Sequence, residues 1–385
     1  MSESRTMIEC VVCGSPDVEL RKLYNDVLRV TSDVRIWKTG GELGVCHACG
    51  MVQKPASETF CKDAEHIYAT YQMYVDTGGT EQKIFTPEGP RPRSDVLLDQ
   101  LIQLEGMPSN VRLLDVGCGA GNLLRAAGRR MASWELYGND ISSHESENIL
   151  AIPGVKGFLA GEVSTIHETF DLVTLSHVLE HIFQPFEFLQ DLKRVLKPNG
   201  VVAILVPNWM DNPFDLLVAD HRSHFTLDHL VAVMQRAGYE VLLQDVKRIP
   251  KEMLVLARPA KATASTTQLK PTTVEALDGK LHWLRSVCAW AVNEKARGGD
   301  YAVLGTAAAA AWLTHAADLN PVCFVDENRD RQGLELFGKK VRDPKDVPAT
   351  TRVLIPLPPH IADPLAVRLN QGLAQPQFLA PKIVG

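Results

Sequence analysis

Three alternating glycines, Gly117, Gly119 and Gly121, follow an apolar stretch that carries Asp115 near its end. This pattern predicts a buried strand that turns sharply into a helix, because glycine at the turn lets the backbone approach a ligand closely. The helix beginning near Asn122 then directs its free N–H groups at the same space. The chemistry that these residues favour is the binding of a cofactor that contains a nucleoside.

The spacing of the glycines indicates which kind of cofactor this is. It is G-x-G-x-G, whereas the dinucleotide-binding fingerprint is G-x-G-x-x-G. The carboxylate of Asp115, just before the loop, would also repel a pyrophosphate. S-adenosylmethionine has no phosphate and carries a sulfonium and an ammonium group, so an acidic pocket suits it. It is therefore the cofactor that we expect.

Two further acidic side chains follow predicted strands in the same part of the chain. The segment 134–140 predicts a second strand ending at Asp140, placed to bind both ribose hydroxyls. A third strand, 157–160, leads to Glu162 and Val163. We expect Glu162 or its neighbours to accept a hydrogen bond from the adenine amino group, with the Val163 backbone facing the ring. For any one acid alone, the alternative is a solvated loop residue.

The next elements complete the wall of the expected pocket. A buried strand over 170–175 leads to His177, which we place beside the methionine end of the cofactor. A helix closing over 192–196 then turns into the strand 201–206. With the elements in this order, the segments DVGCGAG, YGNDIS, SHVLEH and LKPNG resemble the class I methyltransferases.

Composition favours a cytoplasmic enzyme with a small-molecule substrate. The chain has 385 residues, of which 45% are hydrophobic, but no apolar run long enough to span a bilayer. Its N-terminus lacks the apolar stretch of a signal peptide. Forty Lys and Arg residues stand against 46 Asp and Glu residues, without a basic stripe. These features argue against membrane insertion and against nucleic acid as the main partner.

Four of the eight cysteines form two closely spaced pairs, Cys10 with Cys13 and Cys46 with Cys49, and each pair is followed by glycine. Such turns can present four thiolates tetrahedrally to zinc, and a closed site of this kind is structural. Disulfides are the alternative, which a reducing compartment disfavours. The long segment between the pairs should carry strands of its own. We interpret the other cysteines as ordinary core or loop residues: Cys61, Cys118, Cys288 and Cys323.

These landmarks predict an α/β protein in three parts. Residues 1–75 form a zinc-binding module, and residues 76–258 form a class I methyltransferase core with a Rossmann-like fold. A linker rich in Ala, Thr, Lys and Pro over 257–273 leads to a second Rossmann-like domain, 275–385. In that domain, the turn 305–307 stands at the position of the dinucleotide-binding fingerprint but does not have its full pattern of glycines. We therefore expect it to bind no cofactor and to shape the acceptor site.

The three-part layout, with CHACGMVQ in the first part and VDENRDRQG in the last, resembles the sugar C-methyltransferases of deoxysugar pathways over nearly the whole chain. The resemblance implies methyl transfer from S-adenosylmethionine to a carbon beside the keto group of a nucleotide-linked sugar. The family's catalytic pair of an acid and a histidine ahead of an aromatic is matched by Asp220 and His221 ahead of Phe225. The chain has Asp220 where glutamate is common, and Ala219 where tyrosine is common.

This chemistry needs a base, since a carbon next to a carbonyl becomes a nucleophile only after losing a proton. His221 is the candidate base. We expect Asp220 to orient or polarise it, and His181 with Tyr71 or Tyr74 to hold the developing enolate oxygen. The alternative is that His221 lies in a loop before a helix, and that the tyrosines pack in the core.

Two other functions remain open from the sequence. The first is O- or N-methylation of a sugar or related metabolite on the same scaffold, which needs less help from a base. The second is a zinc-containing binding protein that retains cofactor affinity without turnover.

Overall fold

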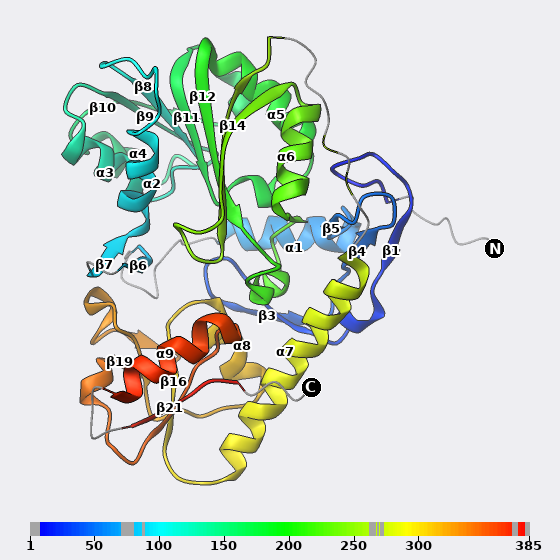
Figure 1. The fold of residues 1–385 in the computed structure, drawn as a ribbon, viewed down its shortest axis with the longest axis vertical. Helices are drawn as coiled ribbons and strands as arrows, with labels where there is room; N and C mark the ends of the chain where they lie inside the picture. The colour runs from blue at the N-terminus through cyan, green and yellow to red at the C-terminus, as the bar shows by residue number, and fades with distance from the viewer. Residues whose placement is uncertain are drawn as a thin grey trace.

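A computed structural model describes the chain in three connected parts (Figure 1). The N-terminal module lies between a central seven-stranded sheet and a C-terminal six-stranded sheet. None of the helices in the part of the chain that the structure describes combines the length and apolar content needed to cross a bilayer. The described residues are 8–70, 81–86, 89–261, 267, 269, 273–371 and 376–381.

The central sheet has the strand order β10-β9-β8-β11-β12-β15-β14. Its first five strands along the chain pair in parallel, and β15 runs antiparallel to both neighbours. The strand order reverses between β8 and β11, and ligands of open α/β sheets bind at such a point. The strands are β8 (Arg112–Val116), β9 (Glu135–Asp140), β10 (Val155–Ala160), β11 (Phe170–Ser176), β12 (Leu196–Pro207), β14 (Tyr239–Asp245) and β15 (Glu252–Pro259).

Helices cover both faces of this sheet, as expected where parallel strands are connected by crossovers. The helix after the glycine loop begins immediately after Gly121 and buries Leu123 and Leu124 on one face. At its other end, Arg130 pairs with Asp99 of the neighbouring helix at 2.6 Å. The helices are α2 (Arg93–Leu101), α3 (Asn122–Arg130), α4 (Ser146–Leu150), α5 (Pro185–Leu192) and α6 (Leu227–Arg236).

The N-terminal module does carry strands between its cysteine pairs, as expected. One of its two sheets has the order β1-β4-β5-β13, in which β13 (Ser223–His224) belongs to the central part of the chain. The two parts are thus joined through a shared sheet. The module's elements are β1 (Val18–Leu20), β2 (Leu28–Val30), β3 (Ile36–Thr39), β4 (Gly44–Cys46), β5 (Val52–Gln53) and α1 (Glu58–Ala69).

The C-terminal part begins with the long helix α7 (Thr273–Ala296). It begins at the last residue of the predicted linker, and Leu277, Leu281 and Leu284 lie on its buried face. The sheet that follows has the order β18-β19-β17-β16-β20-β21 and is parallel except for β18. Its elements are β16 (Tyr301–Leu304), α8 (Ala308–Ala316), β17 (Phe324–Val325), β18 (Glu335–Leu336), β19 (Lys339–Arg342), β20 (Arg352–Leu354), α9 (Pro359–Gln371) and β21 (Gln377–Leu379).

Candidate active site

A cavity lies where β8 and β11 end, at the reversal of strand order in the central sheet. Its volume is about 520 Å³, including the space open to solvent. The sequence patterns did not reveal two of its residues, Glu81, which precedes the hairpin of β6 (Lys83–Thr86) and β7 (Gly89–Pro92), and Arg93, the first residue of α2. The lining includes Glu81, Arg93, Asp115, Gly117, Asn122 and His177.

The three glycines form the predicted turn between β8 and α3. Gly117, Gly119 and Gly121 have φ values of +63°, +48° and +75°, in the left-handed region that favours glycine. A Cβ added to Gly117 would lie 2.5 Å from a methyl group of Val178. The loop therefore has no room for a side chain at Gly117, and its backbone borders the cavity.

We predict that Gly117→Ala lowers affinity for S-adenosylmethionine at least tenfold in calorimetry. The methyl group must displace Val178 while the residue keeps a left-handed backbone, and both effects move the cavity wall. Gly279→Ala is the matched control, because Gly279 lies within α7 and an added Cβ meets no atom within 4 Å. Equal affinities for the two variants would contradict a role for the loop.

Asp115 is 4% exposed, and Thr174 donates a hydrogen bond to its Oδ1 at 2.7 Å. Burial raises the pKa of Asp115 to about 7; the Thr174 hydrogen bond opposes this shift, and the charges of Asp140 and Glu81 add to it. Asp140 ends β9, as predicted, and its Oδ2 accepts a hydrogen bond from the Gly119 N–H at 3.2 Å. Asp115 and Glu81 thus place two carboxyl groups at a cavity wall that also carries Arg93 and His177.

The predicted adenine residues follow β10 as expected but are not among the residues lining the cavity. Glu162 is exposed, and its Oε2 accepts a hydrogen bond from Ser164 at 3.2 Å. The Val163 side chain is buried in the core of the central domain. Their contact with adenine stays a prediction.

His177 lies between two buried carboxylates at the cavity wall. Its Nδ1 is 3.2 Å from Glu180 Oε1, and its Nε2 is 3.2 Å from Glu252 Oε1. Burial and the neighbouring Arg93 lower the pKa of His177, but the two carboxylates outweigh them and raise it to about 9. Arg93 Nη1 also lies 2.9 Å from Nε2, so two carboxylates and a guanidinium group surround the ring. Its φ of +58° is uncommon outside glycine and marks a constrained position.

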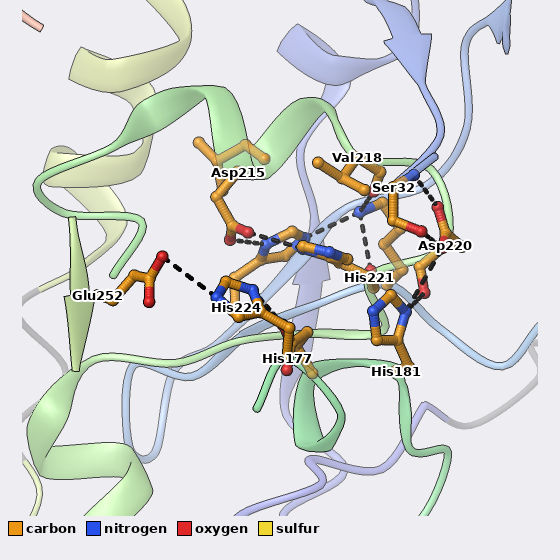
Figure 2. A network of polar contacts seen from close by, with 12 residues as sticks. Ser32, His177, His181, Asp215, Val218, Asp220, His221, His224 and Glu252 are labelled. Carbon is orange, nitrogen blue, oxygen red and sulfur yellow. Dashed lines mark hydrogen bonds and ion pairs between the residues drawn. The ribbon is translucent and has the colours of Figure 1, made fainter. Parts of the chain in front are cut away.

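Near Glu180, a cluster of polar side chains surrounds His221, the predicted base (Figure 2). Asp215 Oδ1 lies 2.7 Å from His221 Nδ1, and its Oδ2 lies 2.6 Å from His224 Nδ1. All three side chains are buried. Burial lowers the pKa of His221, but the charge of Asp215 outweighs it, so the pKa is raised above its ordinary value. With Nδ1 on Asp215, the Nε2 of His221 is the atom that can take up a proton.

Of the role expected for Asp220, to orient or polarise His221, its charge does help to raise the pKa of His221, whereas the group within hydrogen-bond distance of His221 Nδ1 is Asp215. The Asp220 carboxylate accepts hydrogen bonds from the backbone N–H and the hydroxyl of Ser32, and it lies 3.4 Å from His181 Nδ1. Asp215 takes its place at His221 because the 3₁₀ helix η6 (Pro213–Leu217) lies over the following loop. The spacing D-x5-H-x2-H was the only sequence signal for this pairing.

His181 lies beside the base, as expected for a group near the reacting oxygen. Its ring is 4.7 Å from that of His221, centroid to centroid, and nearly perpendicular to it. Tyr68 places its hydroxyl oxygen 2.9 Å from His181 Nδ1. The other candidates, Tyr71 and Tyr74, lie outside the described residues, and α1 ends at Ala69. Their role at the oxygen stays a prediction.

The four paired cysteines meet at one point. The Sγ atoms of Cys10 and Cys49 are 3.5 Å apart, those of Cys13 and Cys46 are 3.6 Å apart, and all four lie within 4.8 Å of one another. Tetrahedral zinc with thiolate ligands requires sulfur separations of about 3.8 Å. Hydrogen bonds with Cys10 and Cys49 lower the pKa of Cys46, which favours its thiolate. The four residues therefore fit a closed, structural metal site.

Comparison with known proteins agrees with the topology of the central sheet. Residues 90–244 match the family described as "Methyltransferase domain". Among curated relatives, the ubiquinone biosynthesis O-methyltransferase of Actinobacillus pleuropneumoniae is 33% identical over 103 residues, covering 24% of this chain and 43% of that protein. The mitochondrial ubiquinone biosynthesis O-methyltransferase of Homo sapiens is 31% identical over 176 residues, covering 37% and 46%. The chain thus spans less than half the length of these relatives.

Two similar solved structures each cover 43% of the chain. The mitomycin 7-O-methyltransferase has a TM-score of 0.38 at 17% identity, covering 43% of this chain and 54% of that one. A SAM-dependent methyltransferase from Aquifex aeolicus has a TM-score of 0.36 at 20% identity, covering 43% and 88%. The family match and the strand order together identify residues 90–244 as a class I methyltransferase domain of the S-adenosylmethionine-dependent type.

Proposed function

We propose that this protein transfers a methyl group from S-adenosylmethionine to the carbon beside the keto group of a nucleotide-linked sugar. The observation that carries the proposal is the buried pair of Asp215 and His221, which supplies an oriented base close to the cofactor cavity. A base of this kind is needed for carbon methylation and much less for oxygen methylation, because a hydroxyl loses its proton more readily than a carbon does.

A short chain of contacts joins the base to the cavity. His177 lines the cavity and lies 3.2 Å from Glu180. Glu180 in turn offers an oxygen within 4.8 Å of ring nitrogens of His181 and His221. An acceptor carbon at His221 therefore lies one or two side chains away from the expected methionine end of the cofactor. This proximity supports direct transfer between the two ligands.

In the proposed reaction, His221 Nε2 removes the proton from the carbon beside the carbonyl, and the C–H electrons form an enolate. Asp215 stabilises the resulting imidazolium through Nδ1, and His181 donates a hydrogen bond to the enolate oxygen. S-adenosylmethionine supplies an electrophilic methyl group whose bonding electrons stay with sulfur as the new C–C bond forms. His221 then releases its proton to solvent.

The proposed cofactor contacts follow from the cavity and from the strand ends around it. The glycine loop supplies backbone groups close to the ligand, and the carboxylate of Asp115 suits a cation. The C-terminal sheet domain is proposed to shape the acceptor site. The residues that we propose for the cofactor are Asp115, Gly117, Gly119, Gly121, Asp140, Glu162, Val163 and His177.

The pKa of Asp115 predicts a pH-dependent affinity for the cofactor. In the protein without ligand, this carboxyl is ionised above about pH 7 and protonated below it. A cationic ligand favours the ionised form, so its Kd should rise as the pH falls below 7, by up to tenfold per pH unit. Calorimetry between pH 5.5 and 8 measures this slope. Asp115→Asn should flatten it, and a wild-type Kd that is constant over this range would contradict the prediction.

O-methylation of a small metabolite is the second candidate, because the relatives that match the central domain are named O-methyltransferases. The experiment that separates the two functions uses keto-sugar nucleotides in D₂O with the purified full chain. Carbon methylation predicts deuterium exchange at the carbon beside the keto group, and a product with a new C–C bond. Methyl transfer to hydroxyl acceptors, without exchange of any keto-sugar, would favour O-methylation.

A further inference from the structure

One buried lysine is not explained by the chemistry above. Lys54 follows β5 of the N-terminal module and is 1% exposed, although lysine is almost never fully buried without partners. Its Nζ lies 2.8 Å from the Val218 carbonyl oxygen, 2.9 Å from the His221 carbonyl oxygen and 2.8 Å from His224 Nε2. Two of these three groups belong to the histidines that share Asp215.

The three contacts of Lys54 determine where the protons lie. An ammonium group has three N–H donors and no acceptor, and here each donor has one partner. His224 must then accept at Nε2, so its single ring proton is on Nδ1 and is donated to Asp215 Oδ2. The other carboxylate oxygen of Asp215 accepts from His221 Nδ1. A continuous chain therefore runs from Lys54 through His224 and Asp215 to His221.

We propose that Lys54 is a positioning residue for the base: its ammonium group keeps His224 neutral, so that the full negative charge of Asp215 is available to His221. The naming of His221 as a base rests on the proposed function, whereas the order of protons in the chain does not. The N-terminal module is thereby assigned a direct part in the active site, through a lysine that it places beneath the histidines.

The surrounding charges are consistent with this order of protons. Burial and then the charge of Lys54 lower the pKa of His224 to about 4. Burial lowers the pKa of Lys54 itself to about 7, although Asp215 opposes this. Between these two pH values, the lysine is charged and His224 is neutral. The titratable or charged groups that face the chain from neighbouring elements are Tyr24, Arg29, Glu180, His181, Asp220 and Arg222.

The test is NMR titration of the full chain with ¹⁵N- and ¹³C-labelled histidine, in which His221→Asn and His224→Asn assign the signals. In Lys54→Met, we expect the midpoint of His224 to rise by at least one pH unit, a tenfold gain in proton affinity. The midpoint of His221 should fall, because protonated His224 then competes for Asp215. Lys62→Met, at an exposed position on α1, should change neither midpoint.

The same substitution made in the His224→Asn variant tests whether Lys54 acts on His221 through His224. In His224→Asn, the asparagine keeps an N–H donor for Asp215 but cannot take up a proton. Adding Lys54→Met to this variant should therefore move the His221 midpoint by less than half of the shift that Lys54→Met causes in the wild type. Equal shifts in both backgrounds would overturn the proposal. If Lys54→Met does not fold, the ¹⁵N chemical shifts of the wild-type histidines at pH 6 show which ring nitrogen of His224 carries the proton. A proton on Nδ1 supports the proposal, and a proton on Nε2 contradicts it. None of these signals needs a substrate, whereas absent exchange of keto-sugars by the wild type counts against the proposed function alone.

Discussion

Replacing His221 with asparagine is expected to lower methyl transfer to a keto-sugar nucleotide by about 10²–10⁴-fold, the range that general bases contribute. Asparagine keeps a polar group beside Asp215 but has no nitrogen that can take up a proton at neutral pH. Affinity for S-adenosylmethionine should change little, because His221 is not among the residues lining the cofactor cavity. Single-turnover rates and calorimetry on the same preparation measure the two effects separately.

Two controls make this result specific to proton removal. His144→Asn, at an exposed position, should leave the rate unchanged. Asp215→Asn should lower the pKa of His221, because the carboxylate is what raises it, and so move the rise in rate with pH to lower values. Deuterium exchange at the substrate carbon should fall in parallel with methyl transfer in His221→Asn. Retained exchange in that variant would show that another group removes the proton.

The sequence predicted the central domain well because its signals are local. The glycines before α3 have a positive φ, and strands such as β8 and β12 contain short apolar runs, so both can be recognised within about ten residues. The two cysteine pairs are likewise short motifs, and the fold brings all four sulfurs together. A cavity lies where the strand order reverses between β8 and β11, and its lining includes Asp115, Gly117 and His177 of the predicted cofactor residues.

The partners of the base were missed because they depend on tertiary packing. Lys54 contacts His224 across 170 positions of sequence, through the pairing of β5 with β13. No periodicity in either segment predicts that pairing. Adjacency in sequence does not imply contact here, because Asp220 precedes His221 but its carboxylate accepts hydrogen bonds from Ser32. By contrast, the predicted end of the linker agrees with the structure, since α7 begins at Thr273, the last residue of that segment.

Replacing Cys46 with serine is expected to remove bound zinc and to destabilise the N-terminal module by several kcal/mol, since structural zinc sites supply a large part of the folding free energy of small modules. Purified wild type should contain one zinc ion per chain by elemental analysis. Cys46 is buried at the end of β4, so an unligated site leaves the strand pairing of β4 and β5 unsupported. A lower Tm in differential scanning calorimetry and the loss of zinc should occur together.

Cys61→Ser is the matched control, because Cys61 lies on α1 outside the cluster and should change neither zinc content nor Tm. The loss of zinc should also reach the active site, since β5 pairs with β13 and places Lys54 against His224. Chelation of the wild type is therefore expected to shift the NMR midpoints of His221 and His224 together with its Tm. Wild type that contains no metal when purified from zinc-supplemented cells would contradict the assignment of this cluster.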